Sequence, residues 1–203
     1  IRDRTITVNL VNCTGNISTK SEGATISLVV DPKTTKFTVQ DEGMTAIEDA
    51  RVFVETADNG GGSGFPYKAS TTSLVQASGT ATCTTTANHL LSTGDQVVVR
   101  GAQPVGYNKV ASITVTGATT FTYTVDSGLS TPATGTPVVS YVPVHGLTNS
   151  LGVIQSSKTW PASQSLTGWA RKSSASPFYK QTSIAVADAS TGTDQLVTLS
   201  LDE

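Results

Sequence analysis

The chain has 203 residues, a formal net charge of −2 and a charged fraction of 14%, against roughly 25% in an ordinary soluble domain. A chain of this length buries enough surface to fold without a disulfide or a metal ion. The small negative charge argues against electrostatic attraction to nucleic acid or to an anionic membrane. No apolar run approaches the roughly 18 residues that indicate a membrane-spanning helix.

Apolar and polar residues alternate in short runs that are bounded by turn-forming residues, which is the pattern of β-strands. In chain order these runs are residues 6–10, 26–30, 37–39, 52–54, 97–99, 113–115, 121–125, 138–142 and 196–201. No window shows a helical stripe, since the one weak candidate, residues 43–50, is too short to bury a face. The sequence therefore predicts an all-β protein.

Changes in composition divide the chain into parts. Asp31-Pro32 ends the first part, because proline restricts the residue before it and cannot donate to a sheet. The glycine-dense stretch 57–66 has the composition of a linker, and residues 70–140 are almost free of charge. We predict an N-terminal β-strand arm or the end of a preceding β-rod in residues 1–31, a discontinuous β-sandwich in residues 32–68 and 142–203, and an inserted β-module in residues 69–141.

The host part resembles the carboxypeptidase-regulatory or transthyretin-like β-sandwiches. In that family a strand ending in Asp and a glycine turn precede the pattern Ile-x-x-Ala-x-Val-x-Val; the matching residues here are Asp41, Gly43, Ile47, Ala50, Val52 and Val54. Residues 147–156 are similar to the family's next turn, with Asn149 where Asp is usual and Gly152 at the turn, and residues 166–174 match a strand that carries an aromatic. The resemblance covers about half of the chain and implies an Ig/transthyretin-like β-sandwich, from which the long insertion is a departure.

The inserted part resembles a small β-module found in many phage tail and other virion proteins. The matching residues are 87–101 (ANHLLSTGDQVVVRG), Tyr107-Asn108 and 118–128 (ATTFTYTVDSG), and they imply a small β-barrel-like module. Leu91 is expected in its core, and Asp95 is expected to cap the turn at residues 92–94 by accepting backbone N–H bonds. We expect Gly101 to end the strand that follows and Tyr107-Asn108 to turn the chain back.

His89, six residues before Asp95, raises the question of a catalytic pair. A pair of this kind needs a nucleophile or a second acid, and the sequence offers no GxSxG frame and no reactive cysteine context. We therefore expect His89 to orient its loop by hydrogen bonding to the backbone. The chain is predicted not to be an enzyme.

The remaining reactive residues give no metal or cofactor site. Cys13 and Cys83 stand in different contexts outside any CxxC motif; we interpret them as two buried thiols, and a disulfide between them stays open. Neighbouring residues on a strand point to opposite faces, so adjacent acidic pairs such as Asp41-Glu42 and Asp202-Glu203 are interpreted as solvated turns. No calcium-loop pattern occurs.

One segment near the C-terminus, residues 169–180 (WARKSSASPFYK), is the candidate contact site. The candidate ligand or subunit contacts are Trp169, Arg171, Lys172, Phe178 and Tyr179. Trp169 or Tyr179 could stack on sugars or on single-stranded nucleic acid, but the chain has no wider basic field. We favour packing in a hairpin and contact between subunits, with Trp169 directed inward and Arg171 and Lys172 directed to solvent.

Together these features predict a non-enzymatic structural or adhesion protein on the surface of a bacterial virus, as a tail fibre, spike or capsid decoration. Expected partners are other copies of the chain, in a trimer or a lattice, other virion proteins and a host-surface glycan, with no nucleic acid and no membrane insertion. The strands in residues 6–30 are expected to pack on another subunit. The alternatives are a bacterial cell-surface or secreted adhesin or carbohydrate-binding module and, more weakly, an accessory domain of a larger hydrolase. Fold resemblance alone does not decide between them.

Overall fold

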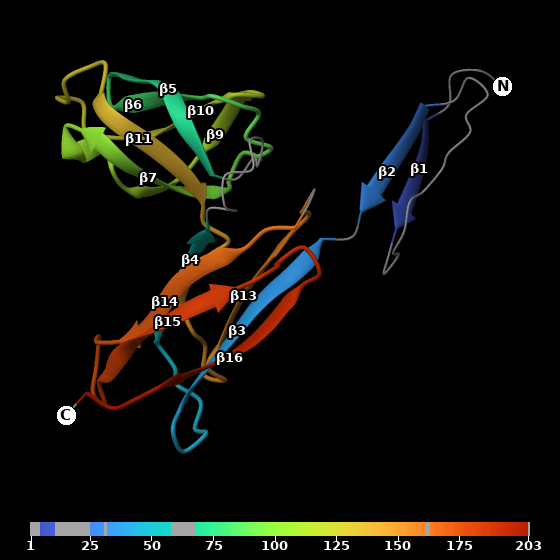
Figure 1. The fold of residues 1–203 in the computed structure, drawn as a ribbon, viewed down its shortest axis with the longest axis vertical. Coiled ribbons are helices and arrows are strands. Elements are labelled where there is room, and N and C mark those ends of the chain that lie inside the picture. Colours follow the sequence, from blue (N-terminus) through green and yellow to red (C-terminus); the bar gives the residue numbers. More distant parts are fainter. Residues whose placement is uncertain (1–4, 11–24, 31, 58–67, 161–162, 203) are drawn as a thin grey trace.

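The computed structural model describes residues 5–10, 25–30, 32–57, 68–160 and 163–202. These residues form strands in four sheets and a single short 3₁₀ turn, so the all-β prediction is confirmed (Figure 1). The elements are β1 (Thr5–Leu10), β2 (Thr25–Val30), β3 (Lys33–Asp41), β4 (Arg51–Thr56), β5 (Lys68–Ala77), β6 (Thr80–Thr85), β7 (Gln96–Gln103), η1 (Val105–Tyr107), β8 (Val110–Ser112), β9 (Thr114–Gly117), β10 (Thr120–Thr124), β11 (Thr134–Tyr141), β12 (Val144–Leu147), β13 (Val153–Lys158), β14 (Leu166–Lys172), β15 (Tyr179–Val186) and β16 (Thr193–Leu199). Among the described residues, none lie in a helix with the length and apolarity needed to cross a membrane.

The β-sandwich consists of a four-stranded sheet, β12-β4-β14-β15, and a three-stranded sheet, β13-β3-β16. Alternate residues of each strand enter its core, such as Phe37 and Val39 from β3 and Val52 and Val54 from β4, all of which are fully buried. The turn predicted before β13 is present, and in it the Asn149 side chain accepts the N–H groups of Leu151 and Val153.

The inserted module consists of one seven-stranded sheet, in the order β8-β7-β11-β5-β6-β10-β9. Most of its buried apolar residues belong to the same hydrophobic cluster as those of the sandwich. The core holds two tyrosines whose hydroxyls are satisfied, as buried tyrosines require. The Tyr107 hydroxyl donates to the Ser130 carbonyl at 3.0 Å, and the Tyr123 hydroxyl donates to the Tyr107 carbonyl at 3.0 Å. In Figure 1 the module lies beyond the β4 end of the sandwich, to which it is joined through β11.

Gly101 does not end its strand, contrary to the expectation from sequence, because β7 continues to Gln103. The chain passes this point with φ of +78°, and a Cβ atom on Gly101 would lie 2.6 Å from the Thr136 carbonyl oxygen. The pairing of β7 with β11 shifts register nearby, between Gly135 and Val138. Two residues of β11, Thr136 and Pro137, thus lie opposite the single residue Gly101, so β11 carries a β-bulge here. Glycine at position 101 allows the close approach of this bulge, and the sheet continues past it.

The N-terminal strands β1 and β2 form a separate two-stranded sheet, and they run parallel with Thr5 opposite Thr25. Figure 1 shows this pair standing apart from the sandwich, beyond the start of β3. Within the described residues, no further strand joins either edge of the pair. Cys13 and the predicted linker, apart from Ala57, lie outside the described residues.

Candidate functional site

His89 is a structural residue of the module. Its side chain is 2% exposed, and its Nδ1 atom accepts the Leu91 N–H at 3.0 Å. The proton therefore sits on Nε2, which donates to the Gly117 carbonyl at 3.1 Å. The ring also lies edge-on against Phe121. Both ring nitrogens are thus engaged with the backbone, as the sequence predicts.

Asp95 caps its turn as predicted, since its Oδ2 atom accepts the Ser92 N–H at 2.8 Å. The same carboxylate binds Lys158 of the sandwich. Leu91 is buried in the core. Asp95 and His89 therefore stabilise separate parts of the loop.

The Cys83 thiol is also unreactive in its surroundings. Cys83 is fully buried in the module, and burial raises the pKa of its thiol to about 12. A thiol of this kind stays protonated and is a poor nucleophile. No group of three or more potential metal ligands gathers among the residues that the structure describes.

The five candidate contact residues separate into two places. Tyr179 is buried in the sandwich core at the start of β15, next to the exposed Phe178. Lys172 is partly buried and pairs with Tyr179. Trp169 and Arg171 lie on β14, whose inward-facing residues are Leu166 and Ala170. Trp169 is therefore not directed into the core, contrary to the packing expected from sequence, and it lies with Arg171 on the outer face of the four-stranded sheet.

On this outer face three rings lie side by side across the strands, in the order His145, Phe53 and Trp169. The Phe53 ring stacks on Trp169 with a centroid distance of 6.1 Å and meets His145 edge-on at 5.8 Å. The guanidinium of Arg171 lies over the Trp169 ring, with Cζ 5.5 Å from its centroid. Trp169 is partly buried, whereas His145 and Arg171 are exposed.

The next row on this face carries two like charges. Arg51 on β4 and Arg171 on β14 are directly opposite each other in the sheet register, and both are exposed. Arg51 lies diagonal to His145 in the register of β4 and β12. Burial and, to a smaller extent, the charge of Arg51 lower the pKa of that imidazole. We call the surface formed by Arg51, Phe53, His145, Trp169 and Arg171 the arginine–aromatic face.

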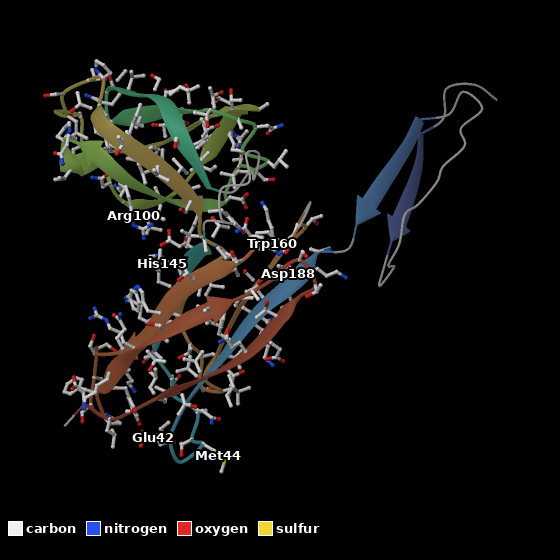
Figure 2. All side chains as sticks on the ribbon, viewed as in Figure 1. Glu42, Met44, Arg100, His145, Trp160 and Asp188 are labelled. Carbon is white, nitrogen blue, oxygen red and sulfur yellow. The ribbon has the colours of Figure 1, made fainter. Side chains whose placement is uncertain are left out.

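The module covers one side of this face. Val98 and Val142 pack on Phe53, which is 7% exposed. Arg100 of β7 pairs with Glu55 of β4 and lies over the Phe53 ring, with Cζ 5.8 Å from the centroid. Figure 2 shows Arg100 and His145 where the module meets the sandwich.

Sequence reasoning missed Arg51, Phe53 and His145, because these residues join Trp169 only through strand pairing. Arg51 and Phe53 lie more than a hundred residues before Trp169 in the chain. The alternation of β4 carries one usable signal. Val52 and Val54 are apolar and inward, so Arg51 and Phe53 must share the outer face. What the sequence does not reveal is that β14 lies next to β4 with Trp169 opposite Phe53.

Comparison with known proteins yields little. No family model matches the chain, and no curated protein matches it. Among solved structures, a double mutant of the shaft pilin SpaA from Lactobacillus rhamnosus GG aligns over 90% of this chain with 10% sequence identity and a TM-score of 0.34. The chain spans about half of that pilin chain, 52% of its length. A likeness this weak carries no conclusion about function.

Proposed function

We propose that the chain is a non-enzymatic structural and attachment protein that works in multiple copies on the surface of a particle or a cell. The observation that carries this proposal is the separate parallel sheet of β1 and β2. Two strands alone are at best marginally stable in water, and parallel sheets are ordinarily covered on both faces. Open strand edges also pair readily with other chains. A second copy of the chain offers the same strands and the same edges.

The particle we favour is a bacterial virion, with the chain in a tail fibre, a spike or a capsid decoration. This choice rests on the resemblance of residues 87–101 to a module of virion proteins. The hydrogen bonds of His89 and Asp95 support a purely structural role for these residues. The second candidate is a bacterial cell-surface adhesin. The exposed arginine–aromatic face supports this candidate as well as the first, since that face would serve attachment in either setting.

The assembly is tested by light scattering coupled to gel filtration, on the full chain and on a variant without residues 1–30. We expect the full chain to form oligomers and the truncated chain to be a monomer that still melts cooperatively. A full chain that stays monomeric at high concentration, with a truncated chain that is unfolded, would show that the two strands belong to the chain's own fold.

The location is tested separately, with mass spectrometry of purified virus particles and of cell-wall fractions from the producing culture. Enrichment in particles supports the virion candidate, and enrichment in the wall fraction supports the adhesin. Recovery of the chain only from soluble cell extract would contradict both.

A further inference from the structure

We infer that the arginine–aromatic face binds an anionic polysaccharide, with the guanidinium groups of Arg51 and Arg171 as the anion-binding groups. This inference rests on the proposed attachment function and names the chemistry that the attachment surface recognises. It starts from the strand register, in which Arg171 is directly opposite Arg51.

The opposed arginines are unfavourable for the fold itself. Side chains directly opposite on neighbouring strands have Cβ atoms about 5 Å apart, and like charges in such pairs are destabilising. Among the described residues, neither Arg51 nor Arg171 forms an ion pair. Glu48 and Asp49, the acidic residues that precede β4, are exposed and leave Arg51 without a salt bridge. An anion bridging the two guanidinium groups would turn this repulsion into attraction.

Among the described residues of β4, β12 and β14, the carboxylate that shares this face is already engaged. Glu55 binds Arg100 of the module, and its side chain is 15% exposed. That pair neutralises Arg100 and leaves Arg51 and Arg171 as uncompensated charges. The net charge of −2 thus conceals a local cationic surface. Guanidinium groups suit this role, because their forked N–H donors match the oxygens of carboxylates, sulfates and phosphates.

The aromatic residues favour an anionic polymer over a neutral sugar. A neutral sugar ring binds by stacking on a free aromatic face, but the Trp169 ring already contacts Phe53 and the Arg171 guanidinium. Phe53 is almost completely covered. The contact of Arg171 with the indole holds this guanidinium over the sheet, and a group held in place loses less freedom on binding. The groups offered to solvent are therefore mainly cationic.

The experiment measures binding of the full-length chain to dextran sulfate, polygalacturonate and uncharged dextran by interferometry at low and raised salt. We expect binding to one or both anionic polymers, weaker binding at raised salt, and none to dextran. The double variant R51Q/R171Q should bind at least about tenfold more weakly, the scale of losing hydrogen bonds to charged groups. The matched control K33Q/K109Q removes the same charge outside this face, and it should bind within about twofold of the unmodified chain.

Thermal melting separates binding from a structural role. Because the two arginines repel each other, R51Q and R171Q should melt at the same temperature as the unmodified chain or higher. Lost affinity with unchanged or raised stability supports the inference. Equal affinity in R51Q/R171Q, an equal loss in the control variant, or no binding of the unmodified chain to either anionic polymer would overturn it. A monomeric chain that binds through Arg51 and Arg171 would contradict the proposed assembly but would support the inference about the arginine–aromatic face.

Discussion

Lys158 of the sandwich binds the carboxylate of Asp95, the residue that caps a turn of the inserted module. The Lys158 and Asp95 side chains are only 13% and 17% exposed, and the Lys158 Nζ atom lies 4.9 Å from the centroid of the Tyr141 ring. One carboxylate therefore closes a local turn and joins the two parts of the fold.

This double role predicts graded losses at Asp95. D95N keeps an oxygen that can accept the Ser92 N–H but removes the charge, whereas D95A removes both interactions. We expect D95N and K158M each to lower the free energy of unfolding by about 1–3 kcal/mol, since each leaves a largely buried partner uncompensated. D95A should lose more than D95N. Denaturant unfolding measures these differences.

The exposed pair of Lys36 and Asp194 provides the control for this series. K36M should change the free energy of unfolding by no more than about 0.5 kcal/mol, the usual scale for surface ion pairs. A loss in K36M as large as that in K158M would show that burial does not distinguish the two pairs.

His89 is expected to contribute to stability and not to binding. H89L removes both ring nitrogens and leaves the buried Leu91 N–H without its acceptor, so the free energy of unfolding should fall by about 1–3 kcal/mol. The affinity for anionic polymers should not change in the folded fraction. A folded H89L chain that has lost attachment would reopen the question of an active site at this loop.

His145 reports directly on the charge of Arg51. Burial and the nearby guanidinium hold the pKa of His145 below its ordinary value of 6.5. R51Q should raise this pKa, and NMR titration of the ring protons measures the change. R171Q is the comparison, because Arg171 lies on β14, one strand further from His145 than Arg51. An unchanged His145 pKa in R51Q would contradict the proximity of the two side chains.

The lowered pKa of His145 also predicts in which direction the stability of the fold changes with pH. The lowered pKa of His145 in the folded chain means that the unfolded chain binds more protons just below pH 6.5. The stability contributed by neutral His145 is therefore present above that pH and is lost as the pH falls through the lowered pKa. Because His145 is exposed, the effect is small, and the difference between the unmodified chain and H145Q in melting scans isolates it.

Replacement of residues 69–141 by a short Gly-Ser loop should leave the sandwich folded but less soluble. The sheets of the sandwich pair only among their own strands, although most of their buried apolar residues share one hydrophobic cluster with the module. Removal of the module uncovers Phe53 and Val142. Full burial of a phenylalanine side chain is worth about 1.5–3 kcal/mol, so its exposure favours association between copies. The further substitution F53T should restore solubility. If the deleted chain no longer melts cooperatively, the module is part of one folding unit with the sandwich.

The strands recovered from sequence were those with large apolar residues at alternate positions, such as Phe37 and Val39 in β3. By contrast, Ala81 and Cys83 of β6 point into the core between threonines, and among the described side chains of β5 Leu74 alone is buried. Small inward residues give a weak alternation, so β5 and β6 were missed, as were the short β8 and β12. The expected hairpin in residues 169–180 reached only the start of β15. The strands with strong alternation were sufficient to predict an all-β architecture without helices.

The candidate site was predicted only in part, because Trp169 was assigned to the wrong face of its strand. Along β14 the inward residues are Leu166 and Ala170, with Gly168 between them. The largest apolar residue, Trp169, is one position out of step, and a shift of one residue reverses the face of every side chain. The order of the strands in the sheet determines which residues of β4 and β12 share this face with Trp169. Composition and local alternation do not encode that order.

The parallel direction of β1 and β2 also constrains how copies can be arranged. If β1 of one copy pairs in parallel with β2 of the next, rotation about an axis parallel to the strands repeats the same contact and can close a ring of copies. A two-fold axis perpendicular to the strands would instead reverse the strand direction in the neighbouring copy. All copies in such a ring point the same way and present their arginine–aromatic faces at one level. A repetitive polymer can then engage several faces at once, so that modest affinity at each face becomes strong and slowly reversible attachment through avidity.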